Sequence, residues 1–260
     1  MMNILKKINS FITRYRRNAD ILETLYKRTA YLSHENGKIK FQQKSGYERH
    51  TEYKKKLSYH HFKKYFDGAV FFDNTNLQRQ FSINKSKSFK IEKAPPFFLE
   101  FGVFNGESIN FFSNFVKKIY GFDSFLGLNE DWKSGYLNHV EGIYGTDSNL
   151  PKVKNNVFLI QGKAQDTLDE FLKNNKPNIV FIHFDVDTYE TTKFILQRVK
   201  PYLSQETIFL FDEFYDFSGW DVGEYKAFKE EIEMDSNFNF EYLGFHTFDN
   251  IVTVKVIKKN

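Results

Sequence analysis

The 260-residue sequence contains no cysteine, which excludes disulfide bonds, thiolate metal ligands and a cysteine nucleophile. It contains no apolar run long enough to form a transmembrane helix. Its N-terminus lacks the continuous apolar core of a signal peptide. A chain without cysteine fits the reducing cytoplasm, and we expect a cytoplasmic protein.

What the sequence does contain is typical of a globular protein with a large core. Hydrophobic residues make up 41% and aromatic residues 18% of the chain. Its length fits one large domain, or one domain with a substantial extension. Pro95-Pro96 follows a polar, basic stretch, and we expect a boundary there, between an extension (1–95) and a catalytic domain (96–260).

Charge is distributed unevenly between these two parts. Residues 1–97 contain 21 Lys and Arg against 8 Asp and Glu, whereas residues 98–260 contain 16 against 25. A basic segment joined to an acidic one indicates that the N-terminal part meets an anionic partner. A phosphate-bearing acceptor, a lipid headgroup and nucleic acid all fit this charge.

Helical periodicity marks the beginning of the basic, mainly helical extension. Apolar residues recur at helical spacing from Ile4 to Tyr15, with Lys and Arg on the rest of the surface. We expect a helix that docks on its own domain or on a partner in a homodimer. Peripheral contact with a membrane surface is the alternative.

After Pro96, apolar segments typical of buried strands alternate with amphipathic segments typical of helices. The predicted strands lie at residues 96–103, 118–124, 155–162, 177–185, 206–214, 238–245 and 250–259. Continuous apolar strands separated by helices indicate a parallel sheet covered on both faces. We therefore expect a doubly wound α/β fold with a mostly parallel seven-stranded sheet and an antiparallel final strand.

Two features after the first and second strands suggest a nucleoside site. The first strand enters its helix through Gly102 and Gly106, and glycines at such a turn let a ligand approach the backbone. The dinucleotide pattern G-x-G-x-x-G is absent, because Phe104 replaces its second glycine. Asp123 follows Gly102 by 21 residues at the end of the second strand, where an acidic residue binds ribose hydroxyls.

The other strand ends carry polar groups too. Gly162, Gln165 and Asp166 follow the third strand, within reach of an adenine, although Asp166 could equally cap the next helix. The remaining two ends bear pairs of acidic residues: Asp185 with Asp187, and Asp212 with Glu213. Since ligands of such folds bind at the carboxyl edge of the sheet, this convergence is the strongest functional signal.

In combination, these motifs resemble those of class I S-adenosylmethionine-dependent methyltransferases, and within them the macrocin O-methyltransferase family of sugar O-methyltransferases. The similar segments are EFGVFNGES, GFDSFLGL, FIHFDVDTY, FDEF and GWDVGEYKAF, within residues 97–258. The resemblance implies methyl transfer from S-adenosylmethionine to a saccharide or other small-molecule hydroxyl. The implied cofactor-binding residues are Glu100, Gly102, Val103, Gly106, Ser108, Asp123, Ser124, Gly162, Gln165, Asp166 and Asp185.

The resemblance also implies a divalent, Mg²⁺-type ion held by Asp185, Asp212 and Glu213, whose oxygen ligands suit a hard cation. Related catechol enzymes carry a lysine base three residues after the first metal aspartate, where this chain has Thr188. The expected catalytic residues are therefore Asp185 and Asp187, with His183 as a weaker candidate for the base.

Alternative functions remain open at this point. Asp185-Val186-Asp187 also fits the D-x-D motif of metal-dependent glycosyltransferases. The basic N-terminal segment suggests a nucleic-acid methyltransferase, although no base-flipping signature supports it, so we do not expect a nucleic-acid partner. Trp220 either stacks on a sugar or packs a loop. The long loop from Phe125 to Pro151 favours a substrate lid.

Overall fold

The computed structural model describes residues 44–88, 94–133, 135, 138–146 and 148–259. The helix expected near the N-terminus, between Ile4 and Tyr15, lies outside these residues. Within the described part, residues from Tyr47 onward form one compact unit. None of the described helices is long and apolar enough to cross a membrane.

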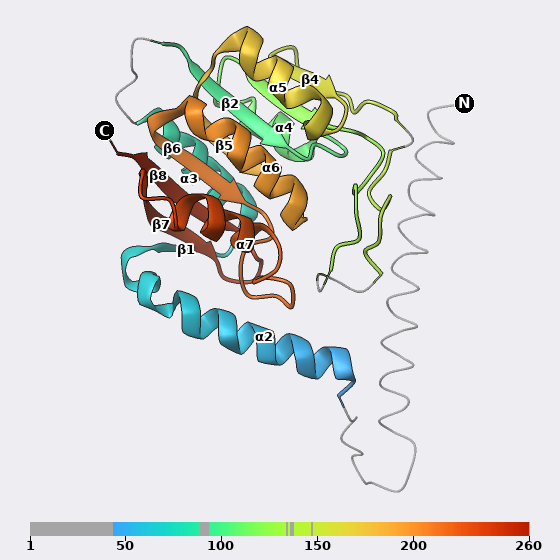
Figure 1. Ribbon diagram of the computed structural model, residues 1–260, viewed down its shortest axis with the longest axis vertical. Helices are drawn as coiled ribbons and strands as arrows, with labels where there is room; N and C mark the ends of the chain where they lie inside the picture. Colours follow the sequence, from blue (N-terminus) through green and yellow to red (C-terminus); the bar gives the residue numbers. More distant parts are fainter. Residues whose placement is uncertain (1–43, 89–93, 134, 136–137, 147, 260) are drawn as a thin grey trace, which may run out of the picture. The chain divides into compact units, whose positions relative to one another are not determined.

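One mixed sheet forms the centre of this unit (Figure 1). The strand order is β1-β7-β8-β6-β5-β2-β3-β4, and only β8 runs antiparallel to its neighbours. The strands are β1 Val70–Phe72, β2 Pro96–Phe101, β3 Ile119–Asp123, β4 Val157–Gln161, β5 Asn178–Phe184, β6 Leu203–Phe211, β7 Phe238–His246 and β8 Val252–Lys258.

The predicted doubly wound fold with an antiparallel final strand is confirmed, but the sheet has eight strands instead of seven. The additional strand, β1, contains only three residues and pairs in parallel with the edge strand β7. Three residues are too few to show a strand period, which is why the sequence pattern misses it.

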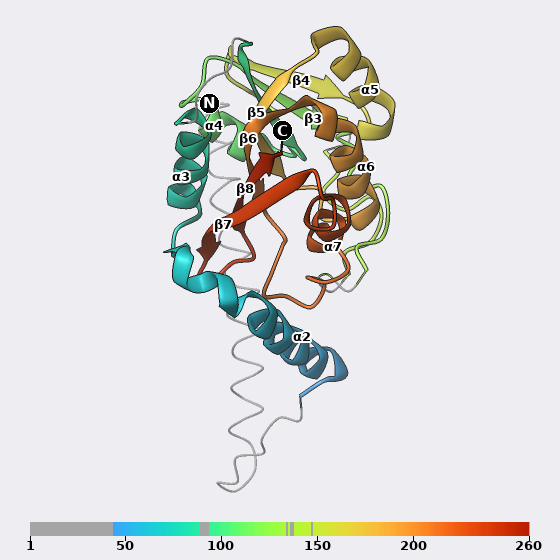
Figure 2. The same cartoon turned by 60° about the vertical axis from the view of Figure 1, so that its left-hand side comes forward.

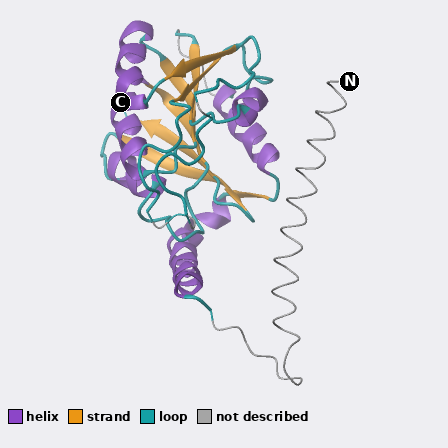
Figure 3. Cartoon of the chain, turned by 90° about the vertical axis from the view of Figure 1, so that its right-hand side faces the viewer, coloured by secondary structure: helices purple, strands orange, loops and turns teal. Residues whose placement is uncertain are grey.

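Helices cover both faces of the sheet (Figures 2 and 3). α3 and α4 lie on one face, while α5, α6 and α7 lie on the other. Alternate residues of β6 face opposite sides, because Ile208 and Leu210 join one core cluster and Phe209 and Phe211 the other. The helices are α2 Gly46–Phe62, α3 Thr75–Lys87, α4 Glu107–Phe112, α5 Ala164–Asn175, α6 Tyr189–Val199 and α7 Glu224–Phe228, with 3₁₀ turns at Lys63–Gly68 and Lys200–Tyr202 and a π-helical turn at Lys229–Glu233.

Two predicted helices are shorter than expected. The helix predicted over residues 107–118 ends at Phe112. It ends there because the side chains of Ser113 and Asn114 donate hydrogen bonds to the backbone carbonyl oxygen of Asn110. The helix predicted over residues 222–234 begins as α7 and continues as the π-helical turn.

The basic segment before β2 contributes to this same unit. Phe62, at the end of α2, is fully buried against aromatic rings that belong to the second half of the chain. These neighbours are Phe214, Tyr215, Trp220, Tyr225, Tyr242 and Phe245, with ring centroids 5.2 to 5.9 Å from that of Phe62. Within the predicted extension up to residue 95, α2, β1 and α3 pack in the unit that contains the sheet.

We predict that Phe62→Ala lowers the free energy of unfolding by about 3–5 kcal/mol, because it leaves a cavity in this aromatic cluster. Urea denaturation followed by circular dichroism measures the loss. Tyr53→Ala is the matched control, since Tyr53 lies on the same helix and is 60% exposed. Equal stability of the two variants would show that α2 does not pack on the sheet.

Candidate active site

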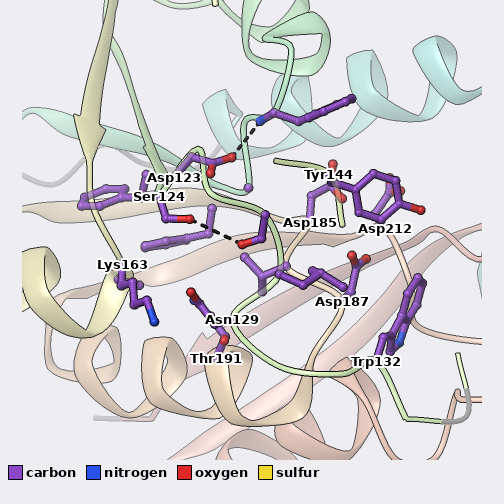
Figure 4. Close-up of a pocket in the computed structure, with 18 of the residues that line it drawn as sticks. Asp123, Ser124, Asn129, Trp132, Tyr144, Lys163, Asp185, Asp187, Thr191 and Asp212 are labelled. Atoms are coloured by element: carbon purple, nitrogen blue, oxygen red, sulfur yellow. Dashed lines mark hydrogen bonds between the residues drawn. The ribbon is translucent and has the colours of Figure 1, made fainter. Parts of the chain in front are cut away.

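A cavity of about 310 Å³ opens at the carboxyl ends of the central strands (Figure 4). Asp123 and Lys163 lie toward one end of it, and Asp187, Asp212 and Trp132 toward the other. Its lining residues are Phe101, Gly102, Phe104, Phe122, Asp123, Ser124, Gly127, Leu128, Asn129, Trp132, Tyr144, Gly162, Lys163, Ala164, Asp185, Val186, Asp187, Thr191, Asp212 and Glu213.

The glycine turn after β2 is required by close backbone packing. Gly102 has a φ of +87°, and a Cβ added there would stand 1.8 Å from the carbonyl oxygen of Asp185. The backbone N–H of Asp185 also donates to the carbonyl oxygen of Phe101. Gly102 therefore lets the ends of β2 and β5 meet, which brings the turn and the aspartates into one cavity.

Asp123 organises the same turn. Its Oδ2 accepts hydrogen bonds from the backbone N–H groups of Val103 and Phe104 at 2.7 and 2.8 Å. Its Oδ1 accepts another from the backbone N–H of Phe125 at 2.7 Å. Asp123 lines the cavity as expected, and these bonds fix its carboxylate there.

The end of β4 reaches the cavity through a different set of residues than the predicted one. Gly162 lines it together with Lys163 and Ala164, whereas Gln165 and Asp166 are exposed and do not. The interpretation of Asp166 as a helix cap is wrong, because Lys163 occupies the N-cap position of α5. Asp166 lies in the first turn, where a negative charge favours the helix dipole.

Other candidate cofactor residues lie behind the cavity wall. Glu100 is fully buried and accepts a hydrogen bond from Ser108 Oγ at 2.8 Å. Val103, Gly106 and Ser108 are buried as well, and none of these four lines the cavity. Gly102, Asp123, Ser124, Gly162 and Asp185 are therefore the candidate cofactor residues that the structure brings together there.

Acidic residues crowd the opposite end of the cavity. Asp185, Asp187 and Asp212 follow β5 and β6 directly, and Glu213 lines the same end. Burial and the neighbouring Asp212 carboxylate raise the pKa of Asp185 well above its usual value. The same two causes raise the pKa of Asp187 to about 7.

Asp187 is held in a conformation that few residues adopt. Its φ is +61°, and the backbone N–H of Thr188 donates to the carbonyl oxygen of Val186 at 2.6 Å, which closes a tight turn around it. Such a left-handed conformation costs on the order of 1 kcal/mol for a residue with a side chain, and backbone strain of this kind is concentrated at functional sites.

Glu213 is the least available member of the predicted metal-binding set. Its Oε2 accepts a hydrogen bond from Asn250 Nδ2 at 2.9 Å, and its backbone N–H donates to Glu224 Oε2. Burial and the adjacent Asp212 raise the pKa of Glu213 well above normal. Burial, with the nearby Asp187, does the same for Glu224.

His183 partly offsets this negative charge from within the sheet. It is fully buried, with Nδ1 3.3 Å from Glu100 Oε2 and Nε2 3.9 Å from Asp212 Oδ1. Burial alone would lower the pKa of His183, but the neighbouring carboxylates of Asp212 and Glu100 outweigh it and raise that pKa to about 9. At neutral pH His183 is therefore an imidazolium.

The arrangement fits a divalent cation. His183, Asp185 and Asp212 offer ligand atoms within 4.8 Å of one another, and the two carboxylates supply the oxygen atoms among them. Asp212 Oδ1 is buried and has no hydrogen-bond partner among the described residues. Carboxylates with raised pKa values around such an oxygen suit a hard cation such as Mg²⁺.

The irregular loop between β3 and β4, for which the sequence predicts a substrate lid over residues 125–151, forms part of the cavity wall. It contributes Leu128, Asn129, Trp132 and Tyr144 to the lining. Burial, and then the carboxylates of Asp187, Glu213 and Asp185, raise the pKa of Tyr144. The sequence contains no signal for Trp132 and Tyr144, because an irregular loop has no period that orients its side chains.

Trp220, the aromatic residue considered as a sugar platform, lies elsewhere. It is buried against His61, Phe62 and Tyr225, with ring centroids 5.3 to 5.6 Å away, and it does not line this cavity.

We predict that Gly102→Ala abolishes binding of S-adenosylhomocysteine, because its Cβ overlaps the Asp185 carbonyl and the left-handed conformation opposes any side chain. Isothermal titration calorimetry measures the affinity. Gly68→Ala is the control, since a Cβ at Gly68 meets nothing within 4 Å. Normal binding by Gly102→Ala would contradict the close approach of β2 and β5.

We predict that Asp187→Asn stabilises the cofactor-free, metal-free protein at pH 8 by roughly 1–4 kcal/mol. The pKa of Asp187 is about 7 in the folded protein and 3.8 in an ordinary aspartate, so its ionisation destabilises the fold as pH rises through this window. The gain should shrink as the pH falls and vanish near about pH 3, where Asp187 is mostly protonated in both the folded and the unfolded state. Urea denaturation at the two pH values, with a chelator present, measures it; a pH-independent difference would contradict the assignment.

Comparison with known proteins agrees with this site. Residues 99–214 match the family described as "Methyltransferase domain". This match argues against the interpretation of Asp185 and Asp187 as the D-x-D motif of a glycosyltransferase. No curated protein sequence matches the chain significantly.

Three solved structures are among those similar to this chain, and the first of them shares its fold. The calicheamicin methyltransferase CalS11 is 21% identical with a TM-score of 0.55, and the match covers 70% of this chain and 77% of that one. The O-methyltransferase NovP is 16% identical (TM-score 0.47; 70% and 80% covered). An O-methyltransferase from Bacillus cereus, solved in complex with SAH, is 12% identical (TM-score 0.42; 80% and 99% covered).

Proposed function

We propose that the chain is a class I S-adenosylmethionine-dependent methyltransferase that methylates a hydroxyl group of a sugar with the help of a divalent cation. The observation that carries this proposal is the cluster of Asp185, Asp187 and Asp212 beside a cavity whose other end is built by Gly102 and Asp123. One end thus fits the adenosine part of the cofactor, and the other fits a cation and the acceptor hydroxyl.

The residues at the glycine turn would hold the cofactor. Asp123 is the candidate hydrogen-bond acceptor for the ribose hydroxyls. Gly162, Lys163 and Ala164 line the same cavity and would contact the adenine ring. The close backbone packing at Gly102 would place the methionine end beside Asp185. Such fixed placement of the methyl group and acceptor oxygen is the main catalytic contribution expected of the protein.

Asp185 and Asp212 would hold the Mg²⁺-type ion, with Glu213 as a further candidate ligand from the sequence. A cation bound there would lower the pKa of a neighbouring hydroxyl group. Asp187 is the candidate general base, because a pKa of about 7 allows a carboxylate to accept a proton near neutral pH. His183, buried between Glu100 and Asp212, would keep the Asp212 carboxylate oriented and ionised.

A sugar acceptor is supported by the resemblance of the motifs to sugar O-methyltransferases. The paired acidic residues at the strand ends suit vicinal hydroxyls, which a single hard cation can bind together. A cytoplasmic location, a homodimer and a role of the basic N-terminal residues in binding phosphate remain predictions.

We predict that Asp185→Asn abolishes methyl transfer, by at least 100-fold, and leaves the affinity for S-adenosylhomocysteine largely intact, because it removes a charge from the reaction centre only. Mass spectrometry of nucleotide sugars and glycosides incubated with S-adenosylmethionine detects the transfer in the wild type, with and without a chelator. Asp166→Asn, at an exposed position outside the cavity, is the control.

Each result separates one part of the proposal from the rest. Full activity of Asp185→Asn would disprove the role of Asp185. Activity unaffected by the chelator would disprove the cation. A wild-type protein that binds S-adenosylhomocysteine but methylates no saccharide would disprove the acceptor class.

A further inference from the structure

A second cavity of about 410 Å³ adjoins the acidic end of the active site. Trp132 lines both cavities, and Thr188 of the second directly follows Asp187 of the first. Gly223, which also lines the second, stands close enough to Asp187 that an added Cβ would lie 3.2 Å from its carbonyl oxygen. The lining residues are Glu130, Asp131, Trp132, Lys133, Thr188, Tyr189, Glu190, Val222, Gly223 and Lys226.

A third cavity of about 450 Å³ lies beside α7, which contributes Tyr225 and Lys226 to its lining. Lys226 lines both the second and the third cavity, so the two are neighbours across one side chain. The third is lined by His61, Trp220, Asp221, Tyr225, Lys226, Lys229, Glu230 and Met234. Three cavities therefore follow one another from the reaction centre outward.

Aromatic rings held by polar partners form the walls of the outer two cavities. The Tyr189 hydroxyl donates to Glu230 Oε2 at 2.6 Å and accepts from Lys193 Nζ at 2.7 Å, while Lys226 Nζ lies 3.9 Å from the centroid of its ring. The Tyr225 hydroxyl lies 2.6 Å from His61 Nε2. Fixed rings next to charged donors and acceptors suit ligands with apolar faces and many hydroxyl groups.

The charge of these cavities does not suit a nucleotide. Three lysines line them (Lys133, Lys226 and Lys229), against five carboxylates (Glu130, Asp131, Glu190, Asp221 and Glu230). Lys54 and Lys193 form ion pairs with Asp221 and Glu230, respectively. With these two lysines the positive and negative charges around the outer cavities are equal, and no excess of positive charge remains. A diphosphate requires an excess of positive charge, whereas a neutral sugar can hydrogen-bond to both kinds of group.

The active-site cavity itself leaves little room for the acceptor. Its volume of about 310 Å³ is close to the lower limit of roughly 300 Å³ for small-molecule sites. A cofactor bound between Asp123 and Asp185 would take up most of this volume, so an acceptor larger than one sugar would extend into the neighbouring cavity.

From this series we infer that the acceptor is an oligosaccharide of neutral sugars, whose successive units occupy the second and third cavities. The inference rests on the proposed sugar methylation and specifies its substrate class. It distinguishes an oligosaccharide chain from a nucleotide sugar, which the outer cavities do not favour.

Two variants that block the cavities from exposed positions test the inference. Val222→Trp fills the second cavity, and Met234→Trp the third; these side chains are 38% and 72% exposed, so neither substitution disturbs the core. Leu77→Trp is the matched control on α3, where the side chain is 55% exposed and lines none of the three cavities.

Methyl transfer is measured with full-length protein, S-adenosylmethionine and Mg²⁺, on one- to four-unit oligosaccharides of the sugar methylated by the wild type. The UDP and dTDP derivatives of that sugar are assayed alongside. We expect kcat/KM of the wild type to rise at least 10-fold from one unit to three. Val222→Trp should raise KM at least 10-fold for oligosaccharides of two or more sugar units. Met234→Trp should do so only for oligosaccharides of three or more units. In both variants kcat and the affinity for S-adenosylhomocysteine should stay unchanged.

The opposite results overturn the inference in distinguishable ways. A kcat/KM independent of chain length, or transfer confined to nucleotide sugars, overturns it and leaves sugar methylation intact. Variants that match Leu77→Trp on the longer oligosaccharides overturn the assignment of the outer cavities. Absence of transfer to every saccharide overturns both the inference and the proposed function.

Discussion

The active site depends on how the protein tolerates several carboxylates at one edge of its sheet. Asp185, Asp187, Asp212 and Glu213 converge there, and like charges in a poorly hydrated site repel one another. The imidazolium of His183, between Glu100 and Asp212, is the counter-charge that the described residues provide within the sheet. The single positive charge of His183 cannot neutralise all of these carboxylates. Burial and this excess of negative charge together raise the pKa values of Asp185 and Asp187.

This imbalance connects structure with the proposed chemistry. A site with excess negative charge attracts a divalent ion, and it also keeps one carboxylate close to neutrality so that it can exchange protons at physiological pH. The backbone supports both effects, because Gly102 brings β2 against β5 and the strained turn at Asp187 turns that side chain toward the cavity. The same turn leads directly into the row of outer cavities, so the reacting group and the acceptor path share one short segment.

Much of this site could be predicted from the sequence, because parallel strands place their carboxyl ends at one edge and the acidic residues directly follow apolar runs. The pairing of Glu100 with His183 could not, since it requires the register that sets these two residues side by side on β2 and β5. The positions of Trp132 and Tyr144 in the cavity could not be predicted from the sequence either, and neither could the three-residue strand β1. The end of α4 depends on hydrogen bonds from Ser113 and Asn114 that a count of apolar positions does not include.

The position of β8 has a consequence for how the molecule opens. β8 lies between β6 and β7, and β1 joins the sheet only through β7, so that the sheet continues from β6 to these three strands through a single antiparallel ladder. Besides that ladder, α3, the aromatic cluster around Phe62 and hydrogen bonds from Phe214 and Tyr215 to Asn250 and His246 hold them in place. Partial unfolding of this edge would therefore also break the hydrogen bond from Asn250 to Glu213 and disturb the acidic end of the active site.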